Sequence, residues 1–285
     1  MTERVVLITG SGRGIGMETA LLFASKGWKV IAGLRNEKAN SPLYVRAKDL
    51  NVLEYIHFKK LDVTSADIQE EVKAVIKEAG RIDVLVNNAG YAAAGYMENF
   101  PVEELRQQFE TNVFGVAAIT QGALPYMRES KGGRIINISS VSGLIPFPVI
   151  GPYAASKHAL EAMTESLSYE LDGTGIEAFL LELGSFQTDI WEKGSVQWSK
   201  RKEKSRLNRK EEALVSDILA RKGSFQDPHM VAEAVYRAAT RKKVPFRIQV
   251  GKGIRGMILL RRFLPFSLWK KLVLRELRQR TGVKN

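Results

Sequence analysis

A tyrosine four residues before a lysine is the pattern in this sequence with the clearest chemical use. On a helix the two side chains lie on one face, and the lysine ammonium favours the phenolate, which suits proton exchange with a carbonyl or hydroxyl group. The spacing alone is weak support, because short motifs recur by chance. The sequence holds three such pairs: Tyr44 with Lys48, Tyr55 with Lys59, and Tyr153 with Lys157.

The surrounding sequence favours Tyr153 and Lys157. Tyr44 belongs to a predicted surface helix, and Tyr55 to a predicted strand, in which a spacing of four does not bring side chains together. Tyr153 opens a predicted helix after a strand that ends at Ser140. That place is the carboxyl edge of the sheet, where open α/β folds bind ligands. We therefore expect Tyr153 and Lys157 to carry carbonyl chemistry.

A glycine-rich turn lies between the first predicted strand and the first predicted helix. Glycines let the backbone turn tightly and approach a pyrophosphate, whose charge sits at the positive end of the helix. The alternative is a turn that only connects the two elements. The predicted dinucleotide contacts are Gly10, Ser11, Gly12, Arg13, Gly14, Ile15 and Gly16.

Short apolar runs alternate with helical patterns along the first two thirds of the chain. This alternation is typical of βαβ units and predicts an α/β fold with a doubly wound parallel sheet, covered by helices on both faces. The predicted strands are residues 5–9, 29–34, 55–63, 82–87, 134–139, 176–183 and 247–251. The predicted helices are residues 15–26, 65–79, 102–129 and 153–172. We expect one domain over residues 1–251, with an insertion at about residues 188–226 that contains helical turns.

The net charge of +12 is unevenly distributed. Residues 1–192 hold 18 Lys or Arg and 24 Asp or Glu, whereas residues 193–285 hold 25 and 7. The basic excess therefore belongs to the insertion and to a C-terminal extension, residues 252–285. With no cysteine the chain has neither disulfides nor thiolate metal ligands, and its three histidines lie far apart, so we predict no metal site.

The extension combines apolar and basic residues. Pro265 is expected to divide residues 254–280 into two short amphipathic helices. Three roles stay open at this point: a lid over an apolar substrate, a subunit contact, or peripheral contact with an anionic membrane surface. Nucleic-acid binding is not expected, because the basic stretches carry few aromatic residues in a stacking arrangement.

Together these motifs resemble the short-chain dehydrogenase/reductase family over about residues 4–251. The resemblance implies a Rossmann fold in which Tyr153 is the general acid or base and Ser140 binds the substrate oxygen. It also implies that Lys157 lowers the tyrosine pKa and holds the nicotinamide ribose, and that Asn112 positions a water for proton relay. The matching segments are Thr9 to Gly16, Asp62 and Val63, Asn87 to Gly90, Asn112, Ser140, and Tyr153 to Lys157.

The same resemblance assigns further cofactor contacts. Asp62 and Val63 would meet the adenine. Asn88, Ala89 and Gly90 would lie on the adenosine side of the cofactor. The family usually has Pro-Gly after the sixth strand, where this chain has Leu183 and Gly184, and Thr188 is available to bind the nicotinamide carboxamide.

The end of the second predicted strand lacks the acid that binds the ribose of NAD. Arg35 stands there instead, and Arg13 is nearby in the glycine-rich turn. Arginines can pair with the 2′-phosphate of NADP, so we predict NADP(H) in preference to NAD(H). The alternative is that Arg35 is a solvated strand-end charge.

Apolar residues are expected on the substrate side. Phe147, Phe186 and Trp191, with Ser140 and Tyr153, predict an apolar alcohol or carbonyl substrate of steroid, retinoid or long-chain type, and the sequence is faintly similar to 17β-hydroxysteroid and retinol dehydrogenases. We expect a cytoplasmic homodimer or homotetramer. The competing hypothesis is a non-catalytic, dinucleotide-binding redox sensor.

Overall fold

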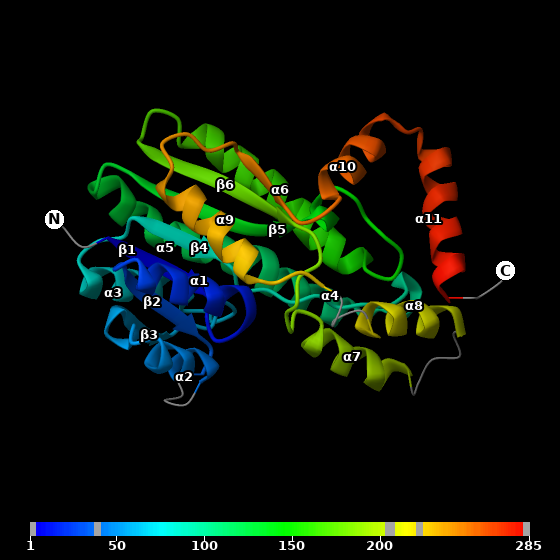
Figure 1. Ribbon diagram of the computed structural model, residues 1–285, viewed down its shortest axis with the longest axis horizontal. Helices are drawn as coiled ribbons and strands as arrows, with labels where there is room; N and C mark the ends of the chain where they lie inside the picture. The colour runs from blue at the N-terminus through cyan, green and yellow to red at the C-terminus, as the bar shows by residue number, and fades with distance from the viewer. Residues whose placement is uncertain (1–3, 37–40, 203–208, 221–224, 282–285) are drawn as a thin grey trace.

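The computed structural model describes residues 4–36, 41–202, 209–220 and 225–281. They form a seven-stranded parallel sheet with helices on both faces (Figure 1). The strand order is β3-β2-β1-β4-β5-β6-β7, so the direction of winding reverses between β1 and β4. The strands are β1 Val5–Thr9, β2 Lys29–Leu34, β3 Ile56–Lys60, β4 Val84–Asn87, β5 Gly133–Ser140, β6 Ile176–Leu183 and β7 Arg247–Val250. The predicted doubly wound α/β fold is confirmed.

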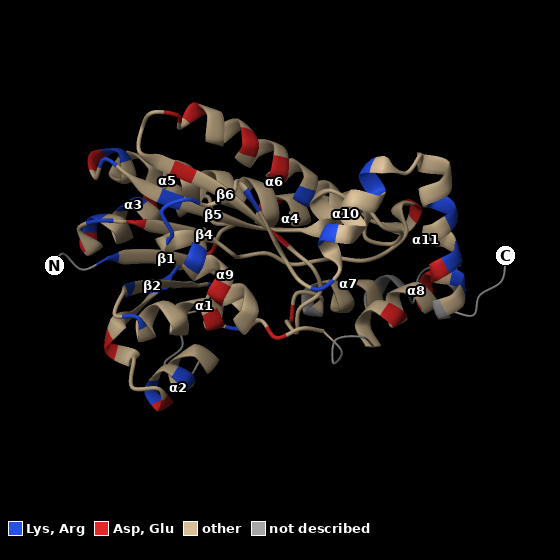
Figure 2. Cartoon of the chain, turned by 45° about the horizontal axis from the view of Figure 1, so that its top comes forward, with Lys and Arg blue, Asp and Glu red and all other residues tan. Residues whose placement is uncertain are grey.

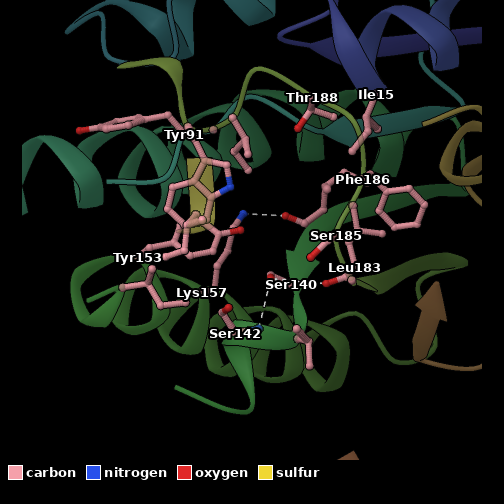
Figure 3. A pocket seen from close by; sticks show the side chains of 18 of the residues that line it. Ile15, Tyr91, Ser140, Ser142, Tyr153, Lys157, Leu183, Ser185, Phe186 and Thr188 are labelled. Carbon is pink, nitrogen blue, oxygen red and sulfur yellow. Dashed lines mark hydrogen bonds between the residues drawn. The ribbon is translucent and has the colours of Figure 1, made fainter. Parts of the chain in front are cut away.

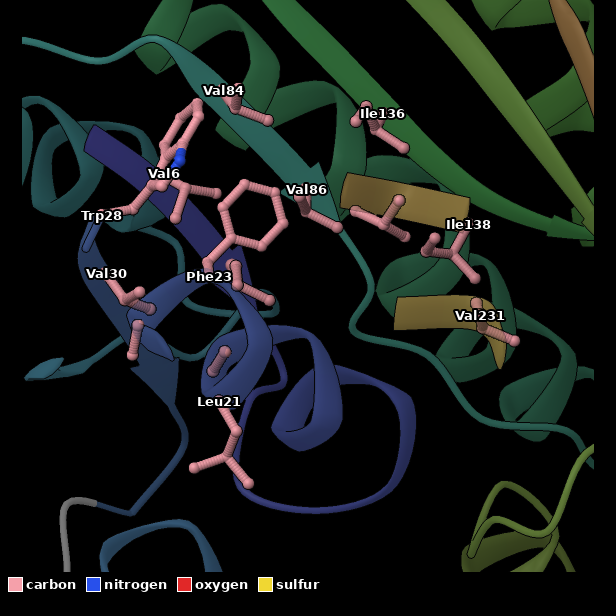
Figure 4. Packing of buried hydrophobic residues seen from close by; sticks show 14 of the residues in the cluster. Val6, Leu21, Phe23, Trp28, Val30, Val84, Val86, Ile136, Ile138 and Val231 are labelled. Atoms are coloured by element: carbon pink, nitrogen blue, oxygen red, sulfur yellow. The ribbon is translucent and has the colours of Figure 1, made fainter. Parts of the chain in front are cut away.

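Successive side chains of the central strands pack to opposite faces of the sheet. Val6 and Ile8 of β1 belong to the core beneath α1 and α9, whereas Leu7 belongs to the core beneath α3 and α5. Figure 4 shows the first of these cores, where Phe23 and Trp28 meet edge to face at 5.1 Å. The helices are α1 Gly14–Ser25, α2 Pro42–Asp49, α3 Ile68–Ala79, α4 Val102–Phe109, α5 Gly115–Glu129, α6 Gly151–Glu170, α7 Glu192–Lys202, α8 Arg209–Ala220, α9 His229–Thr240, α10 Ile254–Phe263 and α11 Phe266–Thr281.

Two elements near the adenine side begin or end away from their predicted limits. The strand predicted over residues 55–63 is only β3, because Tyr55 closes a 3-10 turn and the chain turns again at Asp62, whose Oδ1 accepts from the Thr64 amide at 3.0 Å. The helix predicted from residue 65 begins at Ile68, since Ser65 Oγ accepts from the Asp67 amide and holds a turn before it.

The helix predicted over residues 102–129 is divided by a π-helical turn, Glu110–Phe114, between α4 and α5. All three segments share helical periodicity, so the sequence pattern does not separate them. Gly115 follows the turn and packs so closely on Val63 that a Cβ there would collide with the Val63 carbonyl. Asn112 lies in this turn, and such turns are frequent at functional sites.

The insertion and the extension lie together at one end of the molecule (Figure 1). The insertion contains α7 and α8, and the extension contains α10 and α11 on either side of Pro265, as predicted. Helix α11 packs against α8, so the two basic segments are neighbours in space. Within the described part of the chain, no helix is both long enough and apolar enough to cross a membrane.

Candidate active site

The glycine-rich turn after β1 packs directly against the segment after β4. A Cβ on Gly10 would lie 2.9 Å from Ala89 Cα, and a Cβ on Gly16 would collide with the Gly10 carbonyl and the Asn88 amide. Asn88 Nδ2 donates to the carbonyls of Thr9 at 2.9 Å and Gly10 at 3.1 Å. Glycine is thus needed at positions 10 and 16 for this close packing, and the turn forms a cradle that fits the pyrophosphate of a dinucleotide.

A cavity of about 1320 Å³ runs from this turn along the carboxyl edge of the sheet. Most predicted site residues line it. They are Gly10, Gly12, Arg13, Gly14, Ile15, Arg35, Asp62, Val63, Asn88, Ala89, Gly90, Ser140, Phe147, Tyr153, Lys157, Gly184, Phe186, Thr188 and Trp191. Ser11, Gly16 and Asn112 do not line the cavity. Ser11 is fully buried, and its hydroxyl donates to the Ile8 carbonyl at 2.6 Å.

The cavity brings together Ser140 at the end of β5 with Tyr153 and Lys157 on α6 (Figure 3). All three side chains are buried. Ser140 Oγ accepts from the Ser142 amide at 3.1 Å. Lys157 Nζ donates to the Ile138 carbonyl at 2.7 Å and lies 6.0 Å from the centre of the Tyr153 ring. The i, i+4 spacing on α6 therefore places the ammonium beside the phenol.

Burial dominates the ionisation of both groups. It raises the pKa of the Tyr153 phenol to about 12, against the lowering effect of a hydrogen bond with Ser140. Burial also lowers the pKa of the Lys157 ammonium to about 8, which the Glu161 carboxylate partly offsets. The net shift of Tyr153 is opposite to the lowering expected from Lys157. It leaves the phenol protonated at neutral pH, which is the form that a general acid needs.

Asn112 lies behind the cavity wall and connects two of its elements. Its Nδ2 donates to the Tyr91 carbonyl and to Ser156 Oγ, both at 3.1 Å, and its Oδ1 accepts from the Tyr91 amide at 3.2 Å. Asn112 therefore fastens the segment after β4 to α6, next to Lys157.

A family model described as short chain dehydrogenase matches residues 4–198. The chain belongs to the short-chain dehydrogenase/reductase family. It is 38% identical to the uncharacterized oxidoreductase YusZ of Bacillus subtilis, over 97% of this chain and 99% of that protein. It is 32% identical to a 3-ketodihydrosphingosine reductase of Bacteroides thetaiotaomicron, over 88% and 89%. An NADPH-dependent 3-dehydrocapnine reductase of Ornithobacterium rhinotracheale is 38% identical, over 67% and 68%.

Solved structures of the family have the same fold. A short-chain dehydrogenase/reductase of Burkholderia phymatum, in complex with NAD, superposes with a TM-score of 0.77 at 26% identity, covering 91% of this chain and 93% of that one. The enzyme ElxO with NADP bound superposes with a TM-score of 0.72 at 26% identity, covering 90% and 100%. The protein is thus a nicotinamide-dependent oxidoreductase. The names of these relatives lend no support to the expected similarity to steroid and retinol dehydrogenases.

The departure from the family pattern after β6 has a local structural role. Leu183 extends the pairing of β6 with β7, and the Gly184 amide donates to the Val250 carbonyl at 2.9 Å. A Cβ on Gly184 would approach Ile254 of α10 to 3.1 Å, so glycine also permits the extension to start here. Thr188 then returns to the glycine-rich turn, where it lies against Gly14.

Among the residues that the structure describes just after β2, none that lines the cavity is a carboxylate. Arg35, Asn36 and Ser41 line the cavity there. Asp62 is close by, but its carboxylate accepts from both the amide and the hydroxyl of Thr64. Arg13 lies 3.5 Å from Asp189 in a half-exposed ion pair, and Arg35 is exposed at the edge of the cavity.

The opposite end of the cavity is mainly apolar, although Asp217 of α8 and Arg275, Glu276 and Gln279 of α11 also line it. The ring of Trp191 lies 6.0 Å from that of Tyr153, and Phe147 lies 6.5 Å from Trp269 of α11. Phe186 borders the cavity but belongs to the core beneath α9. The extension supplies further apolar lining, which the sequence did not place in the site: Met257, Leu260, Trp269, Leu272, Val273 and Leu277.

A charge cluster of two buried carboxyls, Glu161 and Glu182, and the partly exposed Arg247 lies next to Lys157 and was also missed from the sequence. Glu161 Oε1 accepts from Ser139 Oγ at 2.5 Å, and Arg247 Nε lies 3.2 Å from both Glu161 Oε2 and Glu182 Oε1. Burial raises the pKa of both carboxyls. Two signals in the sequence pointed to the cluster. Glu161 stands one helical turn after Lys157, and Glu182 is an acid that follows the apolar run of residues 178–181 within its strand.

Proposed function

We propose that this enzyme is an NADP(H)-dependent reductase of a long-chain ketone, with Tyr153 as the general acid. The observation that carries the proposal is the mainly apolar lining of the cavity between Tyr153, Trp191 and α11. Two relatives support it, since their names describe reductases of 3-keto or 3-dehydro compounds, one of them of a long-chain sphingoid ketone. A cavity lined by aliphatic and aromatic side chains favours such a substrate over a sugar.

In the proposed mechanism a nicotinamide bound in this cavity would supply the hydride that the carbonyl carbon accepts. Tyr153 donates its phenolic proton to the carbonyl oxygen, and Ser140 Oγ donates a hydrogen bond to the same atom. Lys157 stabilises the phenolate that remains and holds the ribose hydroxyls of the cofactor. Asn112 holds the segment after β4 against α6, next to Lys157. In this proposal it also positions the water from which the proton is returned to Tyr153.

The chain-length dependence of the reaction tests the substrate class. NADPH oxidation should be followed with straight-chain ketones of increasing length. We expect kcat/KM to rise by up to about fourfold for each added methylene, because burial of one methylene contributes about 0.8 kcal/mol. A flat dependence on chain length would exclude a long-chain substrate.

Arg35 tests the cofactor preference. Arg35→Ala is expected to lower kcat/KM for NADPH by about tenfold to a hundredfold, since a hydrogen bond to a charged group contributes about 1.5–3 kcal/mol. The value for NADH should stay within about threefold, because NADH has no 2′-phosphate for Arg35 to bind. Lys48→Ala on neighbouring α2 removes the same charge and serves as the control. A wild-type preference for NADH would contradict the proposal.

The redox-sensor alternative is not favoured. The structure brings Ser140, Tyr153 and Lys157 into one cavity, and a protein that only binds dinucleotides has no need of this arrangement. We also propose a homodimer or homotetramer in the cytoplasm. Exposed Met97, Val102 and Phe114 on and around α4 support a subunit contact.

A further inference from the structure

The hairpin of α10 and α11 exposes an unusual amount of apolar surface. Among the described residues, seven of the fifteen large apolar side chains that are exposed belong to it. Phe263 and Phe266 on either side of Pro265 are 78% and 66% exposed. Isolated exposed apolar residues are ordinary, but a contiguous group of them marks an interaction surface. The seven are Leu259, Leu260, Phe263, Phe266, Leu268, Leu272 and Leu274.

The hairpin is anchored on its other side, so this exposure belongs to a packed element. Ile254 and Trp269 are buried, and the Trp269 ring lies 6.5 Å from Phe147 in the cavity wall. On α10, Leu259 and Phe263 are one helical turn apart, which places them on one face, opposite to Ile254. The outward face of α10 is therefore apolar. Other residues of the same helix, such as Met257, line the cavity.

Basic residues surround this apolar face. Residues 252–281 contain nine Lys or Arg and a single acid, Glu276. Arg255 and Arg262 are exposed on α10, and Arg261 lies 6.0 Å from the Phe266 ring. Figure 2 shows these cations along α10 and α11, at the end of the molecule away from the N-terminus.

We propose that the face formed by Leu259, Phe263 and Phe266, with Arg255 and Arg262 beside it, docks on the surface of an anionic lipid bilayer. Apolar side chains enter the boundary between headgroups and acyl chains, and the arginines meet lipid phosphates. A second copy of the chain fits less well, because a twofold contact would bring two strongly basic hairpins together.

Docking would also bring the cavity to the membrane. Leu260 is half-exposed on α10 and lines the cavity, and Met257 lines it one turn earlier. A long-chain ketone could thus pass from the bilayer past α10 toward Tyr153 without crossing water. This route rests on the proposed function, whereas the docking surface does not.

The test is sedimentation of the full chain with vesicles of phosphatidylcholine alone or mixed with phosphatidylglycerol. We expect binding to the mixed vesicles that weakens with salt, and little binding to neutral ones. The double variant Phe263→Ser with Phe266→Ser should reduce the vesicle partition coefficient at least about tenfold. Arg255→Gln with Arg262→Gln should reduce it by about fivefold for each arginine.

Matched controls remove comparable groups elsewhere. Val45→Ser with Leu50→Ser removes two exposed apolar side chains near α2, and Lys242→Gln with Lys243→Gln removes two cations between α9 and β7. Both should bind like the wild type, and all variants should keep their activity on a short water-soluble ketone. Equal partitioning of the hairpin variants and the wild type would overturn the proposal. So would loss of self-association in the hairpin variants without change in vesicle binding.

Discussion

Tyr153→Phe is expected to lower kcat for ketone reduction by about a thousandfold, within the range of about 10²–10⁴ typical of a lost general acid. The substitution removes only the phenolic oxygen from a side chain that is 5% exposed. The ring can keep its place 6.0 Å from Trp191, so the cavity and the cofactor site are preserved. The dissociation constant for NADPH, measured by fluorescence titration, should therefore change by less than about threefold.

Tyr44→Phe is the matched control for this experiment. Tyr44 stands four residues before Lys48 on α2, with the same spacing as Tyr153 and Lys157, but away from Ser140. Its loss should leave kcat unchanged. A Tyr153→Phe enzyme with wild-type turnover would refute the catalytic role. A wild-type protein that binds NADPH without turnover, and behaves like the variant, would instead favour the redox sensor.

Arg247→Met is expected to lower the free energy of unfolding by about 3 kcal/mol at neutral pH, the lower end of the range for breaking a buried ion pair. The Glu182 side chain is 0% exposed and that of Glu161 is 5% exposed, so neither carboxylate can recover its solvation in water. The measurement is urea denaturation followed by circular dichroism.

The pH dependence separates this explanation from lost packing. Removal of Arg247 raises the pKa of Glu161 and Glu182 further above that of the unfolded chain, so the folded variant binds extra protons. Its stability must then fall as the pH rises above the ordinary carboxyl pKa, and its deficit relative to the wild type must shrink as the pH is lowered toward that value. A deficit independent of pH would contradict the electrostatic explanation.

Arg237→Met is the control for Arg247→Met. Arg237 forms an i, i+4 ion pair with Glu233 on α9, and both side chains are about half exposed, 47% and 52%. Water solvates these charges well, so the same substitution should cost no more than about 0.5 kcal/mol there.

Local sequence patterns were sufficient to predict most helices and strands of the fold. The apolar runs at β1 and β2 and the proline at position 265 each reflect interactions within a few residues, and the structure has the corresponding elements at the expected places. The limits of β3 and the π-helical turn at Asn112 were not foreseen. The limits of β3 depend on polar turns, such as the one in which Asp62 accepts from the Thr64 amide, and the π-helical turn depends on the packing of Gly115 on Val63, so neither is recorded in the apolar periodicity.

The sequence by itself was enough to predict the doubly wound parallel sheet, the glycine-rich turn and the pairing of Tyr153 with Lys157. Each of these follows from short-range patterns along the chain. Only the tertiary structure decided what surrounds them. It showed that burial raises the pKa of Tyr153, that Arg247 lies between Glu161 and Glu182, and that Trp269 of the extension closes the apolar end of the cavity. Burial and long-range contacts are properties of the packed chain, since they join residues more than a hundred positions apart, as with Phe147 and Trp269, and spacing along the sequence does not record them.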